Sequence, residues 1–160
     1  MTSQRNRGMF LERVINISNK QYLERGLALI NKIPTPTTVN KRKGTGRYTE
    51  KSIVDFTGVS QGSFIAFDAK ETKESRFPFS RLLHHQRTYL NDAHKQGGKA
   101  FVLILFVKEN ELYRLDIEEY ETLIETMGRK SIPLSWFRDN KTQVKSKHGV
   151  YYDYLNIAGG

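Results

Sequence analysis

The sequence predicts an α/β fold in which a central mixed sheet is flanked by helices. Residues 100–107 (AFVLILFV) form a short apolar run with β-branched residues, as in a strand buried on both faces. Residues 53–72 have the pattern of a β-hairpin, and amphipathic helical segments lie before and after them. This order of elements favours one layered domain over residues 1–160.

The N-terminal part is expected to form a helix and then a short strand. Apolar residues recur at helical spacing over residues 10–25, and Gly26 supplies the stop. Residues 27–33 have the composition of a strand, which Pro34 ends because proline cannot donate a hydrogen bond to a sheet.

The hairpin comes next, with strands over residues 53–59 and 63–72 and Gly62 at a turn position. Leucine, tyrosine and alanine side chains then recur on one side of a helix over residues 81–96, which a Gly-Gly pair ends.

In the C-terminal half, residues 112–115 are the expected hairpin partner of the apolar strand. Asp116 and Glu119 have the spacing of a capping box at the start of a helix over residues 117–127. Residues 150–157 are the last expected strand.

Composition narrows the classes of function. The chain has 160 residues, 26 of them Lys or Arg and 17 Asp or Glu, so its formal charge is +9. Such a charge favours a polyanionic partner, nucleic acid first and an anionic membrane surface second. Cysteine is absent, which excludes disulfides, thiolate metal sites and thiol nucleophiles and fits a cytoplasmic protein. We expect no membrane span and no secretory signal, because no apolar run is long enough.

Basic residues gather in two runs. The first lies in a predicted protruding loop over residues 37–51, and residues 1–8 are expected to be a mobile basic N-terminus. Contacts with DNA phosphates are expected there, although solvated loop charges are the alternative. The expected DNA-binding residues are Arg5, Arg7, Lys41, Arg42, Lys43, Arg47, Tyr48 and Lys51, of which Tyr48 could stack on a base. The second run is Arg138, Lys141, Lys145 and Lys147.

The most informative segment is IVDFTGVSQGSFIAFDAKET, residues 53–72. Residues two apart on a strand share a face, so Asp68 and Lys70 project together. Asp55 lies on the preceding strand and can approach Asp68 across the hairpin. Two carboxylates beside an ammonium form a hard-oxygen site for Mg²⁺ against a phosphodiester, where Lys70 could orient a water. A lone Asp-x-Lys, by contrast, is usually a solvated strand face.

These residues resemble the PD-(D/E)xK nuclease motif, and the wider chain resembles the RecU family of Holliday-junction resolvases. The matching stretches run in the same order along nearly the whole chain: NRGMFLE, KIPTPT, VDFTGV, FDAKET, FPFSRLLHHQ, GGKAFVLILF, SIPL and DYL. The resemblance implies a restriction-endonuclease-like fold. It also implies a homodimeric, Mg²⁺-dependent endonuclease, in which Mn²⁺ can substitute, that makes paired symmetric nicks in four-way DNA junctions during recombination and repair. Recombinase or branch-migration proteins are the implied partners.

The resemblance also implies roles for individual residues. The metal-binding acids of the family fall on Asp55 and Asp68, and its motif lysine falls on Lys70. Glu12 matches an acid often found near the metal, and Gln86 matches a polar position that helps to place the water or the phosphate. A surface acid favoured by the helix dipole is the alternative for Glu12.

Some positions depart from the family or carry a plainer interpretation. The family usually has glutamate where this chain has Asp68, and the segment over residues 37–51 is shorter than in cellular members. His84 and His85 are expected to supply helix-surface polarity or a phosphate contact. Trp136 and Phe137 are expected in the core or in dimer packing, after the SIPL segment.

Three alternatives remain open from the sequence. One is a nuclease of the same superfamily with another specificity, such as a restriction or repair nicking enzyme. The second is a non-catalytic DNA-binding protein that assists recombination. The third is a basic protein that binds membranes or acidic proteins.

Overall fold

The computed structural model describes residues 9–34 and 53–159. All eight expected DNA-binding residues therefore lie outside the described residues: Arg5, Arg7, Lys41, Arg42, Lys43, Arg47, Tyr48 and Lys51. The elements in chain order are α1 (Met9–Glu24), β1 (Leu29–Lys32), β2 (Phe56–Ser60), β3 (Ser63–Thr72), β4 (Arg76–Pro78), the 3₁₀ turn η3 (Phe79–Arg81), α2 (His84–Lys95), β5 (Lys99–Phe106), β6 (Glu111–Asp116), α3 (Ile117–Thr126), β7 (Ser131–Pro133) and α4 (Leu134–Asn140).

Five strands form one mixed sheet in the order β1-β2-β3-β5-β6. Neighbouring strands run antiparallel except for the central pair, β3 and β5, which is parallel. A parallel pair needs a long crossover, and here the crossover contains β4, η3 and α2. Every residue of β5 after Lys99 is buried, which confirms the predicted central strand.

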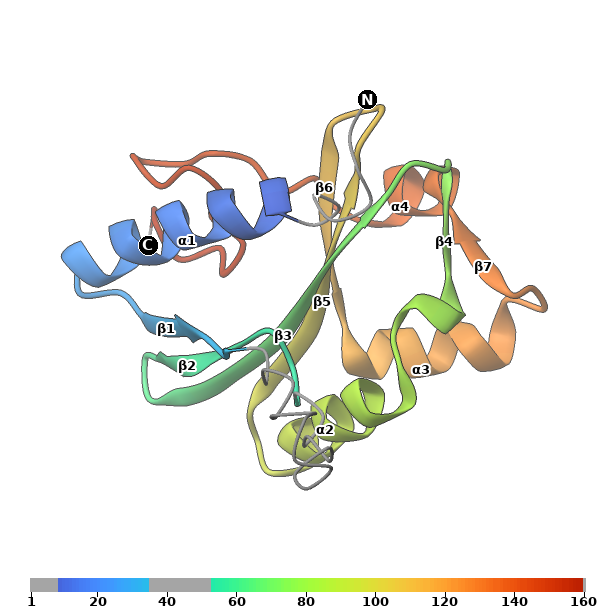
Figure 1. The fold of residues 1–160 in the computed structure, drawn as a ribbon, viewed down its shortest axis with the longest axis horizontal. Helices are drawn as coiled ribbons and strands as arrows, with labels where there is room; N and C mark the ends of the chain where they lie inside the picture. Colours follow the sequence, from blue (N-terminus) through green and yellow to red (C-terminus); the bar gives the residue numbers. More distant parts are fainter. Residues whose placement is uncertain (1–8, 35–52, 160) are drawn as a thin grey trace, which may run out of the picture.

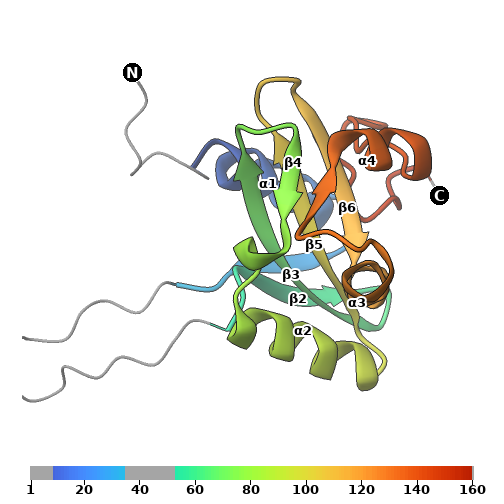
Figure 2. The same cartoon turned by 90° about the vertical axis from the view of Figure 1, so that its right-hand side faces the viewer.

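The sheet separates two apolar cores (Figure 1). The α1 face is covered by α1 and by the segment that follows α4, with Phe67 and Phe101 among its buried residues. The α2 face is covered by α2, α3 and α4, with Ala66 and Val102 among its buried residues. Figure 2 shows the small β4-β7 sheet beside η3 and α4. Side chains alternate along a strand, so Asp68 lies on the α2 face, as Val102 opposite it does.

The predicted strand over residues 150–157 is wrong. The segment forms turns, with one isolated bridge between Lys147 and Val150. The Asp153 carboxylate accepts hydrogen bonds from the backbone N–H groups of Ile157 and Ala158, at 3.1 and 3.0 Å, and so folds the chain back on itself. The apolar side chains here are buried one by one against α1 and do not alternate as in a strand.

Three further features differ from the predictions: the start of one helix, the cap of another, and two elements near the C-terminus. Helix α2 begins at His84 because the preceding residues form η3. The Asp116 side chain does not cap α3; it accepts a hydrogen bond from Arg114 Nε at 2.9 Å. Residues 131–140, left without secondary structure by the sequence pattern, form β7 and α4. Phe137 of α4 is fully buried and Trp136 packs against it, so both belong to the core.

In residues 9–34 and 53–159, the helices are all too short or too polar to cross a membrane.

Candidate active site

The start of the hairpin brings two aspartates together. Asp55 lies one residue before β2, and β2 pairs with β3 so that Phe56 is opposite Phe67. The Asp55 N–H donates to Asp68 Oδ1 at 3.0 Å, and the Ala69 N–H donates to Asp55 Oδ2 at 2.9 Å. Each carboxylate thus bonds the backbone of the opposite strand, which confirms the predicted approach of Asp55 to Asp68.

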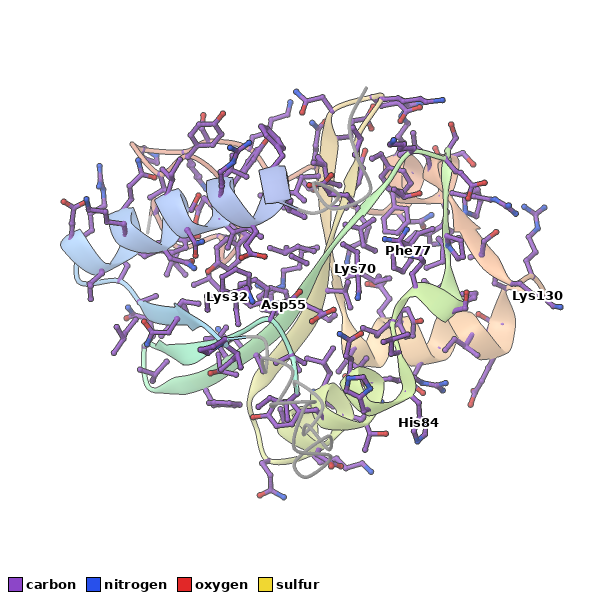
Figure 3. The ribbon with its side chains drawn as sticks, in the orientation of Figure 1. Lys32, Asp55, Lys70, Phe77, His84 and Lys130 are labelled. Atoms are coloured by element: carbon purple, nitrogen blue, oxygen red, sulfur yellow. The ribbon has the colours of Figure 1, made fainter. Side chains whose placement is uncertain are left out.

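Lys70 completes a compact polar cluster with these carboxylates. Its Nζ lies 2.9 Å from Asp68 Oδ2 and donates to Gln86 Oε1 at 3.2 Å. The same oxygen of Gln86 accepts the Leu83 N–H at 3.0 Å, at the start of α2. Gln86 is buried, so it fixes the lysine relative to the first turn of the helix. Figure 3 shows Asp55 and Lys70 near the middle of the sheet, beside β3.

The Asp68 carboxylate is fully buried, at 0% exposure. Burial raises its pKa to about 7, and the nearby Asp55 carboxylate adds to this rise, whereas the Lys70 ammonium opposes it. Asp68 Oδ2 accepts no well-directed hydrogen bond from any described residue, although the Lys70 ammonium lies close to it. The ion pair with Lys70 offsets part of the cost of burying this carboxylate, and the raised pKa shows that the compensation is incomplete.

This donor set fits a hard divalent cation. Mg²⁺ binds oxygen ligands, and often only one or two carboxylates, because water and substrate phosphates fill its other positions. Asp68 offers Oδ2, whose near neighbour is the Lys70 ammonium, and the half-buried Asp55 stands beside it. Within the two described ranges, no three His, Cys, Asp or Glu side chains meet as a metal site. Among the described residues, the ligands for a cation would therefore be the two aspartates.

Glu12 does not join the aspartates in such a group. It is half-buried in the first turn of α1, and its carboxylate has no hydrogen bond or ion pair with another described residue. His84 is exposed, and in Figure 3 it lies away from Asp55 and Lys70, which agrees with helix-surface polarity. His85 is half-buried on the same turn.

The sequence pattern missed a buried carboxylate next to the site, and it did not show how β1 reaches Asp55. Glu71 is buried on the α1 face, where its Oε2 accepts the Leu11 N–H at 2.9 Å and ties β3 to the start of α1. Strand alternation could have found it, because it places Glu71 opposite to Lys70 on a covered face. Lys32 ends β1 beside Asp55 in Figure 3, and the next residue's N–H donates to Asp55 O at 2.7 Å.

Comparisons with known proteins agree with this geometry. The family model described as recombination protein U matches residues 6–159. A protein of Pediococcus pentosaceus named Holliday junction resolvase RecU is 38% identical, over 93% of this chain and 81% of its own length. A protein of the same name from Lactococcus lactis subsp. lactis is 39% identical, over 94% of this chain and 76% of its own length.

The fold also has a counterpart among solved structures. Hjc of Archaeoglobus fulgidus, a Holliday junction resolvase, superposes with a TM-score of 0.50 at 11% identity, over 81% of this chain and 94% of its own. The mixed sheet between helices is thus the restriction-endonuclease-like fold, as expected. The family match over nearly the whole sequence, the two relatives and the paired aspartates on the β2-β3 hairpin agree: this chain belongs to the recombination protein U family.

Proposed function

We propose that this chain is a single-domain endonuclease that resolves four-way DNA junctions in homologous recombination and repair. The observation that carries the proposal is the cluster of Asp55, Asp68 and Lys70 at the hairpin, in which two carboxylates meet beside one ammonium. It is supported by membership of a family whose relatives are named Holliday junction resolvase.

In the proposed reaction, Asp55 and Asp68 hold a divalent cation, Mg²⁺ or Mn²⁺. When bound, that cation supplies positive charge to the scissile phosphate. The Lys70 ammonium orients the attacking water and stabilises the negative charge that develops on the phosphate oxygens. Gln86 keeps the Lys70 ammonium in place through its shared Oε1. Glu12 remains a candidate for contact with the water or the phosphate.

Binding is proposed to follow the shape of the junction. Lysine and arginine residues contact phosphates without reading bases, so affinity should fall steeply with salt. The cations expected to serve here lie in residues 1–8 and 37–51. Paired symmetric nicks need two active sites related by a two-fold axis, so the proposed active form is a homodimer. Recombinase or branch-migration partners and a cytoplasmic location belong to the same proposal.

The test is cleavage of a labelled mobile four-way junction beside a linear duplex of matched sequence, with Mg²⁺, Mn²⁺ or EDTA. Wild type, Asp68→Ala and a control, Asp139→Ala, are compared; Asp139 is an exposed acid of α4. We expect metal-dependent paired nicks on the junction alone, lost in Asp68→Ala while junction binding persists.

The other outcomes identify the alternatives. Equal cleavage of the linear duplex would point to a nuclease of another specificity. Junction binding without cleavage under either metal would move the protein to the class of recombination accessory proteins.

A further inference from the structure

One groove of the described structure lies on the α1 face of the sheet, away from the aspartates. It has a volume of about 720 Å³ and is lined by β5, β6 and the segment after α4. Arg114 stands in it with its guanidinium 4.0 Å from the Phe101 ring, which belongs to the α1-face core. Asp68 and Lys70 pair in register with residues of the opposite core. The groove and the candidate active site therefore lie on opposite faces.

The groove carries a surplus of positive charge. Its lining includes five cationic side chains: Lys99, Arg114, Lys141, Lys145 and Lys147. Asp116 pairs with one of them, at 2.9 Å from Arg114, and Glu119 pairs with another, at 2.7 Å from Lys141. The three remaining lysines are exposed and have no carboxylate partner among the described residues.

The acidic residue at the base of the groove does not offset these charges fully. Asp153 is buried, and its oxygens accept hydrogen bonds from Tyr22 Oη at 2.6 Å and from two backbone N–H groups. These donors stabilise the Asp153 carboxylate inside the protein, away from the solvent side of the groove. The solvent side of the groove is thus dominated by Lys99, Lys145 and Lys147.

The wall that bears these lysines is held by backbone hydrogen bonds. The Lys145 carbonyl accepts the Asp153 N–H at 3.1 Å, and Lys147 exchanges two hydrogen bonds with Val150, at 3.0 and 2.9 Å. The Arg114 guanidinium donates to the Tyr154 carbonyl at 3.2 Å. A fixed wall loses less conformational entropy when a ligand binds.

We propose that this groove binds the sugar-phosphate backbone of duplex DNA, as a second contact for the DNA on which the nuclease acts. The inference rests on the proposed function in taking DNA as the polyanion. Lysine ammonium groups suit phosphates as point charges. Single strands are usually held by exposed aromatic rings, and the one aromatic residue among the described lining residues, Tyr154, is buried. The chemistry of the groove therefore favours a duplex arm.

The test compares two full-length double variants with the same change in charge. The groove variant is Lys145→Glu/Lys147→Glu, and the control is Lys20→Glu/Lys108→Glu, whose lysines are exposed outside the groove. Binding of a fluorescent four-way junction and of a linear duplex is measured by anisotropy in EDTA over a series of salt concentrations. Cleavage at saturating junction is measured separately with Mg²⁺.

We expect the groove variant to bind both DNAs at least about tenfold more weakly than the control. Its plot of log Kd against log salt should be shallower by about 2, since each lost phosphate contact removes about 0.9. Its cleavage rate at saturation should equal that of the control. Equal affinity and equal salt slope in the two variants would overturn the proposal. Binding of both variants to phosphatidylserine vesicles is measured as well. If the groove variant binds vesicles more weakly but DNA as well as the control does, the proposal is also overturned. Because binding is measured in EDTA, an inactive wild type would count against the proposed nuclease function alone.

Discussion

Asp68 and Glu71 lie three residues apart on β3, and both carboxylates are buried, but their surroundings differ. Glu71 faces α1 and accepts a backbone N–H from the first turn of that helix. Asp68 faces α2 beside a second carboxylate; its Oδ1 accepts the Asp55 N–H, and its Oδ2 lies 2.9 Å from the Lys70 ammonium. Asp153 resembles Glu71, because donors on α1 and in the C-terminal turn meet it. Burial alone therefore does not distinguish these carboxylates, whereas the second carboxylate and the ammonium beside Asp68 do.

The largest expected effect is a difference in junction cleavage between variants of Asp68 and of Glu71. Asp68→Asn keeps the shape of the side chain but removes the charge that would hold a cation. We expect junction cleavage at saturating DNA to fall by about 10²- to 10³-fold, as when a charge-stabilising group is lost from an active site. Glu71→Gln should lose less than about tenfold. The cleavage rates are measured in single-turnover assays. Similar losses of rate in both variants would show that Asp68 and Glu71 do not differ in their roles.

The second effect is on stability and depends on pH. The native Asp68 carboxyl holds its proton up to about pH 7, against 3.8 for the ordinary group. Between these values the native state binds more protons than the unfolded state, so the free energy of unfolding decreases as pH rises. This difference in the pKa of Asp68 between the native and unfolded states changes the free energy of unfolding by up to about 4 kcal/mol.

Urea unfolding in EDTA at several pH values checks this sign. The wild type should become less stable from about pH 4 to pH 7 relative to Asp68→Asn, and the difference should level off above about pH 8. A difference that stays constant with pH would show that Asp68 titrates as an ordinary carboxyl. Glu71→Gln serves as the comparison from the other face of the strand.

The third effect is on stability, and here the change at Glu71 should matter more than the change at Asp68. Glu71→Ala leaves the Leu11 N–H without its acceptor in a buried place, which should cost about 1–3 kcal/mol in the free energy of unfolding. Asp68→Ala in EDTA at pH 8 should cost less, because the lost contacts with the Asp55 N–H and the Lys70 ammonium are offset by removing a buried carboxylate whose raised pKa disfavours the ionised form. Chemical denaturation of both variants measures this. Greater destabilisation by Asp68→Ala would make that carboxylate structural.

The same contrast shows how far the sequence could lead. The Asp68-Ala69-Lys70 spacing and the hairpin were enough to bring the two aspartates together, because strand period and turn position are local properties. The satisfied carboxylates could not be identified, because their donors come from distant parts of the chain, such as Leu11 for Glu71 and Tyr22 for Asp153. The C-terminal segment was mistaken for a strand for the same reason: its apolar residues are buried by α1, and the turn at Asp153 decides its path.

The smallest effect concerns the link between Lys70 and α2. Gln86 Oε1 accepts from both Lys70 Nζ and the Leu83 N–H, so Gln86→Ala frees the lysine and leaves a backbone donor unmet. We expect cleavage at saturating DNA to fall about tenfold, within the range found for residues that orient an active-site group, with the junction Kd unchanged. Gln86→Glu keeps an acceptor for both donors and should recover most of the rate, whereas His85→Ala, on the same turn, should leave it unaltered. A Gln86→Glu variant as slow as Gln86→Ala would mean that the amide itself is needed, and a weaker junction Kd in Gln86→Ala would assign this side chain to DNA binding. The position of Lys70 then depends on α2 as well as on the strand that carries it, so the ion pair with Asp68 on β3 depends on the helix that covers this face.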